Sequence, residues 1–362
     1  MTDLQEPPTP APPIDMDKLM GFVFRAVDEV GASLHTGLVV MGDKLGYYRA
    51  MRDGASTARR LAEATGTGEP YAREWLNAQA AGGIVDYDPS TGAYTLPAEH
   101  AVALTDETSP AFLPGLFQIA LGTLQDSDRI IEKARSGAGL GWHEHNHDVH
   151  EGCERFFAPS YNAYLVAQWL PALDGVVAKL ESGARVIDIG CGHGASTVIM
   201  AKAFPRSTFL GTDYHQASIT EARRRAEDAG VADRVTFEVA SAEGQGGRGY
   251  DLATTFDALH DMGDPVGAAR AVRAALADDG TWMVVEPMSG DHVEENFNPV
   301  GRAFYGFSTL LCTPASLSQE VGLAIGTQAG PAKIRDVVTA GGFSSCERVA
   351  ETPFNQVLEI RP

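Results

Sequence analysis

The chain has 362 residues, which is enough for two domains of ordinary size. Its formal charge of −20 argues against a nucleic-acid-binding surface unless basic residues are locally concentrated, and no apolar run approaches the roughly 18 residues that a membrane helix needs. The N-terminus shows no signal sequence, and the four cysteines form no close pair that would predict a zinc knuckle or a disulfide framework. We therefore expect a cytoplasmic globular protein without membrane contact.

The N-terminal part of the chain predicts a tail followed by two helices. Residues 1–14 contain a run of prolines that cannot form a helix or a core, so we expect a disordered tail. A first, amphipathic helix is expected after the tail, because apolar side chains recur at helical spacing at Leu19, Phe22, Val23, Ala26, Val27 and Val30. A second helix is expected from Leu38 to Met51, ending at Asp53-Gly54.

Residues 15–110 are expected to form a winged-helix domain. Ser56 and Thr57 can cap a short helix through Ala64, and residues 66–68 form a glycine-containing turn. Two short strands on either side of residues 88–92 predict a β-hairpin with a polar turn. Between the turn and the hairpin, a helix over residues 69–79 should direct three large side chains inward, namely Tyr71, Trp75 and Leu76.

Winged helices can bind DNA, but the charge of this one argues against that role. Residues 51–100 contain four arginines and no lysine against seven acidic side chains. A helix that reads DNA needs several Lys or Arg side chains free to engage phosphates. We therefore expect no nucleic-acid partner and interpret the second helix of the motif as a packing helix.

Residues 111–172 predict a helical linker that also forms a substrate lid. An apolar helix is expected over 111–123, followed by a flexible glycine-rich stretch over 136–141. Residues 142–150 then hold four histidines in a short polar loop. An amphipathic helix from Glu151 to Trp169 should bridge the two domains.

The histidine-rich loop leaves two interpretations open. With four further potential ligands nearby, it has the residue types that bind metals, namely Glu144, Asp148, Glu151 and Cys153. Alternating histidines in a glycine-flanked loop have no fixed register that would present them together. We therefore favour a polar loop over the substrate cleft, in which one or two histidines contact substrate, and we expect no metal site.

From residue 173 to 362, strands and helices alternate, which is typical of an open, mostly parallel, doubly wound α/β sheet. The last two strands, over 346–350 and 356–360, should close the sheet as a hairpin with one antiparallel strand. Helices are expected over 221–230 and 265–276. The preceding strands are expected over residues 186–189, 208–212, 235–239, 250–256 and 281–286.

A glycine-rich turn follows the first of these strands. The pattern Gly190-x-Gly192-x-x-Ala195 also fits dinucleotide-binding proteins, so the glycines alone do not separate NAD from another adenosine cofactor. Asp188 separates them, because a carboxylate two positions before the first glycine would repel a pyrophosphate but suits a sulfonium or an ammonium group. Asp213, at the end of the second strand, is placed to bind both ribose hydroxyls.

These features resemble the class I S-adenosylmethionine-dependent methyltransferases. The run Asp188-x-Gly-x-Gly-x-Gly194 is similar to their first motif. From about residue 20 the whole chain resembles a bacterial group of these enzymes with an N-terminal winged helix, related to small-molecule O-methyltransferases. The resemblance implies a Rossmann-like catalytic domain, S-adenosylmethionine as cofactor, and a winged helix that makes a homodimer. Further matching stretches are residues 71–76, 83–87, 257–265, 285–287 and 352–355.

Carried over by position, the resemblance implies a cofactor site along the strand ends. The glycine loop would hold the methionine part, Asp213 the ribose, and Tyr214 would pack against adenine. The family often has an aspartate for the adenine amino group where this chain has Ser241, so adenine recognition falls to Ser241, a backbone carbonyl or Glu243. The residues expected to bind cofactor are Asp188, Gly190, Gly192, Gly194, Asp213, Tyr214, Ser241, Ala242, Glu243, Phe256 and Asp257.

His260 is the candidate general base. Its ordinary pKa of about 6.5 leaves neutral imidazole available at cytoplasmic pH. In plant-type O-methyltransferases the histidine of a similar motif is the base and a glutamate at the end of the next strand orients it; Glu286 holds that place here. A further acidic partner of that family is missing near residues 326–330. The alternative is that His260 packs near the cofactor and takes no proton.

Substrate contacts are expected from the histidine-rich loop, the bridging helix and an aromatic stretch within residues 298–311, although aromatics at helical spacing are also typical of a core. The predicted function is O-methylation of a small, aromatic or polyketide-like metabolite. Alternatives are N-, S- or C-methylation, a cofactor-dependent reaction without methyl transfer, and a cofactor-sensing regulator that binds DNA. The expected substrate contacts are Trp142, His143, Phe157, Tyr161, Phe304 and Phe307.

Overall fold

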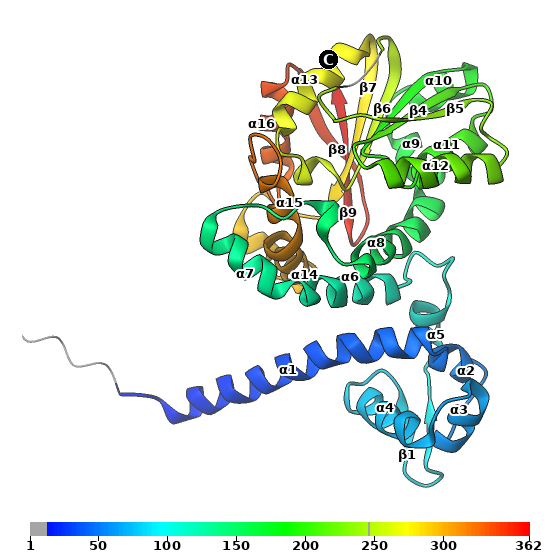
Figure 1. Ribbon diagram of the computed structural model, residues 1–362, viewed down its shortest axis with the longest axis vertical. Coiled ribbons are helices and arrows are strands. Elements are labelled where there is room, and N and C mark those ends of the chain that lie inside the picture. The colour runs from blue at the N-terminus through cyan, green and yellow to red at the C-terminus, as the bar shows by residue number, and fades with distance from the viewer. Residues whose placement is uncertain (1–12, 245–246) are drawn as a thin grey trace, which may run out of the picture. The chain divides into compact units, whose positions relative to one another are not determined.

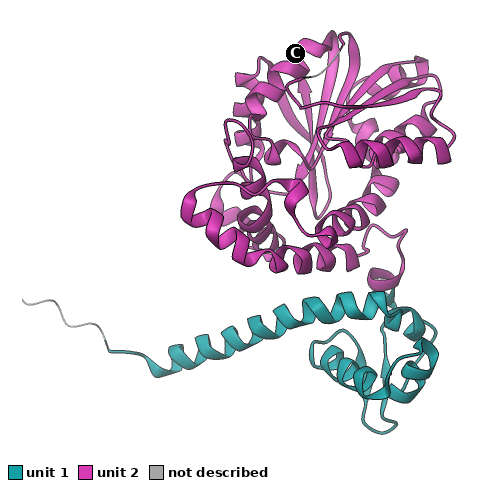
Figure 2. Ribbon diagram, viewed as in Figure 1, with its two compact units in different colours: residues 1–101 teal, residues 102–362 magenta. Residues whose placement is uncertain are grey.

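The computed structural model describes residues 13–244 and 247–362, which form two compact units (Figure 2). The first unit extends to residue 101 and the second from residue 102 to the C-terminus. Residues 1–12 of the predicted tail lie outside the described part of the chain. No helix among the described residues combines the length and the apolar character needed to cross a bilayer.

The first unit is a winged helix preceded by a long helix. Its elements are α1 (Met16–Lys44), α2 (Tyr47–Met51), α3 (Ala58–Thr65), α4 (Glu69–Ala81), β1 (Asp86–Asp88) and β2 (Ala93–Thr95), and α5 (Ala98–Thr105) follows. The expected capping by Thr57 is confirmed, since its side chain accepts a hydrogen bond from the Arg60 N–H group. The prediction of a second helix beginning at Leu38 is wrong, because α1 continues to Lys44 and is ended by Gly46 in a left-handed conformation.

The core of this unit is built around Trp75. The Trp75 ring packs edge-on against Tyr47 and Tyr48, with ring centroids 4.8 and 5.0 Å apart, and its indole N–H donates to the Leu38 carbonyl. Trp75 and Leu76 point inward as expected. Tyr71 does not, because it is 71% exposed and lies outside the buried stripe of α4, which consists of Ala72, Trp75, Leu76 and Gln79.

The second unit is organised on a seven-stranded sheet with the order β5-β4-β3-β6-β7-β9-β8. Strand β9 is antiparallel to both neighbours and the other pairs are parallel, which confirms the predicted closing hairpin. The strands are β3 (Arg185–Ile189), β4 (Thr208–Asp213), β5 (Val235–Val239), β6 (Tyr250–Phe256), β7 (Leu276–Pro287), β8 (Ser345–Glu351) and β9 (Asn355–Arg361).

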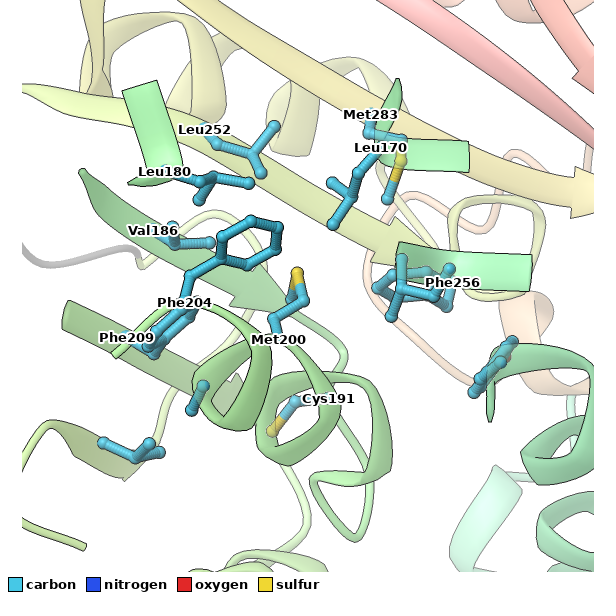
Figure 3. Packing of buried hydrophobic residues seen from close by; sticks show 14 of the residues in the cluster. Leu170, Leu180, Val186, Cys191, Met200, Phe204, Phe209, Leu252, Phe256 and Met283 are labelled. Carbon is cyan, nitrogen blue, oxygen red and sulfur yellow. The ribbon is translucent and has the colours of Figure 1, made fainter. Parts of the chain in front are cut away.

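Helices cover both faces of this sheet (Figure 1). One face carries α10 (Val176–Ser182), α11 (Ala195–Ala203) and α12 (Gln216–Asp228), and the other α13 (Pro265–Ala275) and α16 (Pro331–Ala340). Each face of the sheet has its own hydrophobic core, and successive side chains of a strand enter alternate cores. Val186 packs in one core with Met200 and Phe204 (Figure 3), whereas the next residue, Ile187, packs in the other. This alternation fixes the strand register.

A helical layer lies at the carboxyl edge of the sheet (Figure 1). Helix α8 continues directly into a π-helical segment, Tyr161–Trp169, so the predicted bridging helix is present but starts four residues earlier than expected. Helix α7 was not predicted. The helices of this layer and its flanks are α6 (Pro114–Gln125), α7 (Ser127–Ser136), α8 (His147–Ser160), α9 (Leu170–Ala172), α14 (Pro299–Phe307) and α15 (Thr313–Leu317).

Helices α6 and α8 approach closely because glycines face each other at their contact. A Cβ atom on Gly115 of α6 would lie 2.6 Å from the Phe156 nitrogen, and one on Gly152 of α8 would lie 2.7 Å from the Ile119 nitrogen. Real Cβ contacts are not this short, so no larger residue fits without moving a helix. The glycines thereby set the position of α8.

We expect Gly152→Val to lower the free energy of unfolding by about 1–3 kcal/mol or more, because the added side chain must push α6 and α8 apart. Gly306→Ala is the matched control: Gly306 lies inside α14, and a Cβ added there would meet no atom within 4 Å, so alanine should be neutral or stabilise the helix by up to about 1 kcal/mol. Thermal unfolding of both variants checks this. Equal melting temperatures for the two variants would contradict the packing argument.

Candidate active site

A cavity of about 890 Å³ opens at the carboxyl ends of β3, β4, β5 and β6. Helix α8 and the start of the π-helical segment form another wall of it. Ligands of open α/β sheets bind at this edge because the strand ends and their loops converge there. The cavity residues expected from the sequence are Gly190, Gly192, Asp213, Tyr214, Ser241, Ala242, Glu243, Phe256, Asp257, Trp142, Phe157 and Tyr161.

The glycine turn after β3 forms the floor of the cavity. Gly190 and Gly192 line it, and both have positive φ. Gly194 does not line it, although it was expected to bind cofactor. A Cβ on Gly194 would lie 2.7 Å from the Phe237 ring, so this glycine is needed to seat the turn against β5. Helix α11 begins directly after it.

Asp188 lies behind the turn and does not line the cavity. It is buried, and its carboxylate accepts hydrogen bonds from the hydroxyls of Ser196, Thr197 and Thr254 at 2.7, 2.6 and 2.9 Å. Burial raises the pKa of Asp188, although the hydrogen bonds from these three hydroxyls act to lower it. The carboxylate is therefore occupied in fixing the turn to α11 and β6, and direct cofactor contact by Asp188 is not supported by its position.

Asp213 at the end of β4 lines the cavity and holds the glycine turn. Its carboxylate accepts the N–H groups of Gly192 and His215 at 3.0 and 2.8 Å. Burial raises the pKa of Asp213, although these two backbone hydrogen bonds act to lower it. Tyr214 follows it, and the segment Ser241–Glu243 after β5 also lines this part of the cavity, where the adenosine part of the cofactor is expected.

His260 and Glu286 come together because they follow two neighbouring parallel strands, β6 and β7. His260 lies on a single 3₁₀ turn, Leu259–Asp261. Its Nδ1 lies 2.5 Å from the Glu286 Oε2 atom, and the Leu259 N–H group donates to Glu286 Oε1 at 2.9 Å. Both side chains are almost fully buried. The predicted pair of the Glu286 carboxylate and the His260 imidazole is therefore in hydrogen-bonding contact.

The other imidazole nitrogen of His260 faces Asp261, with Nε2 3.3 Å from Oδ1. Burial opposes a charge on His260, but the carboxylates of Glu286 and Asp261 outweigh it and hold the pKa of the imidazole well above its usual value. Of the described residues, Asp261 lines the cavity and His260 lies just behind it. The imidazole is therefore separated from the cavity by Asp261, a lining residue whose Oδ1 atom faces Nε2.

Asp257 follows β6 directly and lies three positions before His260, where it is half-buried. Its backbone has φ +48°, which is unusual for a residue other than glycine. The Tyr161 hydroxyl donates to one carboxyl oxygen at 3.1 Å and the Asn355 side-chain amide to the other at 2.8 Å. Burial and the nearby Glu286 carboxylate raise the pKa of Asp257 to about 8.

The acceptor end of the cavity differs in part from the expectation. Trp142, Phe157 and Tyr161 line it, whereas His143 does not and instead stacks near His215 with ring centroids 6.4 Å apart. Phe304 is buried and Phe307 packs in an apolar cluster with Leu311, so both belong to the core and not to the cavity wall. Two further lining residues, His150 of the histidine-rich stretch and Cys153, were considered from the sequence only as part of that loop and as a potential metal ligand, whereas Asp261, Met262, Ala315 and Gln319 were not singled out.

The histidine-rich stretch is more ordered than a loop. Its first part is a 3₁₀ turn and its last part, from His147, is already helix α8, which supplies a register that the sequence did not reveal. Its histidines take separate partners: His145 Nδ1 lies 3.1 Å from Asp126 and His147 faces Glu151. Among the described residues, three potential metal ligands converge elsewhere, at His260, Asp261 and Cys312.

Glu154 connects α8 to the cofactor side of the cavity. Its carboxylate faces His193 of the glycine turn at 2.8 Å and Arg225 of α12 at 2.5 Å. Burial would raise the pKa of Glu154, but the hydrogen bonds from His193 and Arg225 prevail and lower it to about 2. Glu154 is therefore ionised at neutral pH, and its contacts with His193 and Arg225 hold α8 against the glycine turn and α12.

The charge of the cavity suits a cationic ligand. None of its described lining residues is a lysine or an arginine, whereas seven are acidic: Glu154, Asp213, Glu243, Asp257, Asp261, Asp264 and Glu320. S-adenosylmethionine carries a sulfonium and an ammonium group, which a negative cavity attracts, whereas the pyrophosphate of NAD would be repelled. The residues present therefore fit the cofactor that the sequence predicts.

Family comparisons agree with this interpretation. Residues 180–320 match the methyltransferase domain family, and residues 34–106 match the Rv2258c-like winged HTH domain family. The mitomycin biosynthesis 6-O-methyltransferase of Streptomyces lavendulae is 26% identical over 257 residues, covering 67% of this chain and 71% of that protein. The ubiquinone biosynthesis O-methyltransferase of Bordetella parapertussis is 33% identical over 126 residues, 34% of this chain and half of its own length.

Solved structures establish the fold over nearly the whole chain. The mitomycin 7-O-methyltransferase MmcR aligns with a TM-score of 0.70 at 20% identity, covering 96% of this chain and all of that one. Human N-acetylserotonin methyltransferase, solved with S-adenosylmethionine, aligns with a TM-score of 0.68 at 13% identity, covering 94% and 97%. Together, the two domain families show that the chain joins an S-adenosylmethionine-dependent methyltransferase domain to an N-terminal winged-helix domain, and the solved structures share its fold.

Proposed function

We propose that the protein transfers a methyl group to a hydroxyl of a small, uncharged aromatic or polyketide-like metabolite. The observation that carries this proposal is the buried pair of His260 and Glu286 beside the cavity. Transfer to a hydroxyl requires removal of a proton, and an imidazole oriented by a carboxylate is suited to that task. The names of the mitomycin and ubiquinone relatives also specify oxygen as the methylated atom.

The proposed cofactor contacts follow the strand ends. Asp213 would bind the ribose hydroxyls, Tyr214 and Ser241–Glu243 the adenine, and the turn at Gly190 and Gly192 the methionine part. When bound, S-adenosylmethionine supplies an electrophilic methyl group. Phe256 and Asp257 also line the cavity and both contact Tyr161, and we place the sulfur beside them.

The chain's own residues align the acceptor and manage its proton. Trp142, Phe157 and Tyr161 would hold an aromatic ring at the acceptor end, while the acceptor hydroxyl faces the His260 and Asp261 side of the cavity. His260 Nε2 takes the hydroxyl proton as the oxygen–carbon bond forms, and Glu286 stabilises the imidazolium through Nδ1. Bound S-adenosylmethionine would supply the methyl group, and the electron pair of the carbon–sulfur bond would leave with the departing thioether.

A matched panel of acceptors tests the choice of atom. Catechols, the corresponding thiophenols and the corresponding anilines are incubated with the enzyme and labelled S-adenosylmethionine, and the methylated atom is identified by mass spectrometry. We expect label on oxygen. Label on sulfur or nitrogen alone would replace the proposal by the alternative of S- or N-methylation, in which His260 need not take a proton.

A DNA-binding role of the winged helix stays an alternative with a direct test. The acidic balance of residues 51–100 predicts no sequence-selective binding. A gel-shift titration against genomic fragments over increasing salt checks this prediction. Selective binding that persists at moderate salt would instead identify a cofactor-sensing regulator.

We further propose that helix α1 pairs with α1 of a second copy. Six of its exposed apolar residues follow each other at alternating spacings of four and three, which is the repeat of a two-helix seam. Each of them is at least 39% exposed within the chain, so none is covered by the unit that carries it. The stripe consists of Met16, Met20, Val23, Val27, Val30 and Leu34.

We expect the double substitution Val27→Asp and Val30→Asp to convert a dimer into a monomer, because it places charges in the centre of this seam. Light scattering coupled to size-exclusion chromatography measures the mass. Ala32→Asp is the control, since Ala32 is exposed on the opposite side of α1 and should leave the dimer intact. A double variant of unchanged mass would contradict pairing through this stripe.

A further inference from the structure

Asp257 occupies a position that the fold alone does not explain. It is a carboxyl that lines the cavity after β6, the strand beside β3 and its glycine turn, it contacts Tyr161, and its backbone has positive φ. Backbone strain of this kind costs free energy and persists only where the surroundings enforce it. Here the Asp257 N–H group donates to the Val285 carbonyl at 2.8 Å, which fixes the strained residue to β7.

Two side chains from distant segments hold the carboxyl group itself. Tyr161 comes from the π-helical segment and Asn355 from the start of β9, and each donates one hydrogen bond to a different carboxyl oxygen. Both donors are themselves buried, at 8% and 1% exposure. The carboxyl is therefore held in one orientation, against the cavity, by residues that do not belong to its own strand.

A fixed carboxyl at this place distinguishes the two forms of the cofactor. S-adenosylmethionine carries a positive sulfur, and S-adenosylhomocysteine, the product, carries a neutral one. The remaining groups of the two molecules are the same. An ionised carboxylate near the sulfur therefore stabilises the first more than the second, by Coulomb attraction in a site of low polarisability.

We propose that Asp257 is the residue through which this enzyme senses the charge on the cofactor's sulfur, with Tyr161 and Asn355 as its positioning residues. When ionised, Asp257 favours S-adenosylmethionine over the neutral product and so promotes exchange of product for substrate. When Asp257 is protonated, the affinities for S-adenosylmethionine and S-adenosylhomocysteine are almost equal, and the carboxyl does not stabilise the sulfonium before transfer. This inference rests on the proposed position of the sulfur beside Asp257 and does not depend on the acceptor.

The ionisation of Asp257 determines the pH at which this discrimination appears. Burial and the Glu286 carboxylate raise its pKa to about 8, while His260, Tyr161 and Asn355 act in the opposite direction. The titratable groups that face it are Tyr161, Cys153 of α8, His260 and Glu286. Since a neutral carboxyl becomes a carboxylate as pH rises, the preference for the cationic form should increase through this range.

The test compares the dissociation constants of S-adenosylmethionine and S-adenosylhomocysteine by calorimetry from about pH 6.5 to about pH 9.5. The sulfonium lowers the pKa of the amino group of S-adenosylmethionine itself, so the rise due to Asp257 is the difference between the ratios of the wild type and of Asp257→Asn. We expect the preference for S-adenosylmethionine to rise about tenfold across this range in the wild type, because each unit by which the sulfonium lowers the pKa of Asp257 is a tenfold change in affinity. Asp257→Asn should abolish the rise.

Two further variants sharpen the test. Asp264→Asn removes a carboxylate from the same cavity but keeps a helix-capping side chain, so it should retain the rise. Tyr161→Phe removes a hydrogen bond that lowers the pKa of Asp257, so the midpoint should move to higher pH; this variant also serves if Asp257→Asn does not fold. A preference in the wild type that is constant with pH but lost in Asp257→Asn would still support charge sensing.

The proposal is overturned if the wild type and Asp257→Asn show the same preference at every pH, or if Asp264→Asn loses the rise as completely as Asp257→Asn does. Should Asp257→Asn fail to fold, a midpoint unchanged in Tyr161→Phe overturns it. These results are independent of methyl transfer. If no hydroxyl acceptor is methylated, the proposed function fails while the affinity ratio still decides the role of Asp257.

Discussion

Replacing His260 by alanine should lower turnover by about 10²–10⁴-fold, the usual contribution of a positioned general base. The affinity for S-adenosylhomocysteine should remain nearly unchanged, because His260 is not among the described residues that line the cavity. The wild-type rate should rise with pH above the range in which an ordinary histidine titrates, since Glu286 and Asp261 raise the pKa of His260 and the imidazole must lose a proton before it can accept one. The variant should lack this rise.

The experiment measures turnover with a hydroxyl acceptor and binding by calorimetry on the same preparations. His147→Ala is the matched control, because it removes a histidine from α8 whose side chain is 87% exposed. Its turnover should equal that of the wild type. Wild-type turnover in His260→Ala would show that His260 only packs beside the cofactor site, which is the alternative left open by the sequence.

Replacing Asp213 by alanine should weaken cofactor binding by about 10²-fold or more, or about 2.7 kcal/mol. The carboxylate is the proposed partner of both ribose hydroxyls, and hydrogen bonds to a charged group contribute about 1.5–3 kcal/mol each. Its loss also releases the Gly192 N–H group, which Asp213 now holds at 3.0 Å. The Asp213→Ala substitution therefore affects both the ribose contact and the glycine turn.

Calorimetry with S-adenosylhomocysteine measures this effect, and Asp213→Asn separates its two parts. An asparagine oxygen can still accept from Gly192 but carries no charge, so we expect an intermediate loss of affinity. Asp228→Ala removes an exposed carboxylate of the same region, at the end of α12, and should bind normally. An Asp213→Ala protein that binds as tightly as the wild type would contradict the ribose assignment.

The sheet and the cofactor end of the site could be predicted because short-range patterns determine them. A buried strand that ends in glycines specifies a strand, a turn and a helix, and strands β5 and β6 have the predicted limits. The pairing of His260 with Glu286 came from the family resemblance, and it is realised because β6 and β7 are neighbouring parallel strands whose carboxyl ends lie side by side.

The acceptor end was predicted less well because it depends on which face of a helix points to the cavity. His150, Cys153, Phe157 and Tyr161 lie at spacings of three and four on α8 and its π-helical extension, and they share the cavity face. That stripe is visible once α8 is known to begin at His147. Phe304 and Phe307 show the converse, since an aromatic pair at helical spacing turned out to serve the core.

The role of Asp188 differs from the expectation for a related reason. The sequence shows a carboxylate before the glycines but not the three hydroxyls that fold back on it from α11 and β6. These contacts join residues up to 66 positions apart. The negative charge that suits the cofactor is supplied instead by carboxylates that come from several other elements and line the cavity.

Transfer of a labelled methyl group from S-adenosylmethionine to a panel of small aromatic hydroxyl compounds tests the central proposal most directly. The structure predicts a product labelled on oxygen, formed by the wild type and reduced at least about 10²-fold in His260→Ala. A wild-type protein that binds S-adenosylmethionine but labels only sulfur, nitrogen or carbon acceptors, or that labels hydroxyls equally well without His260, would contradict it.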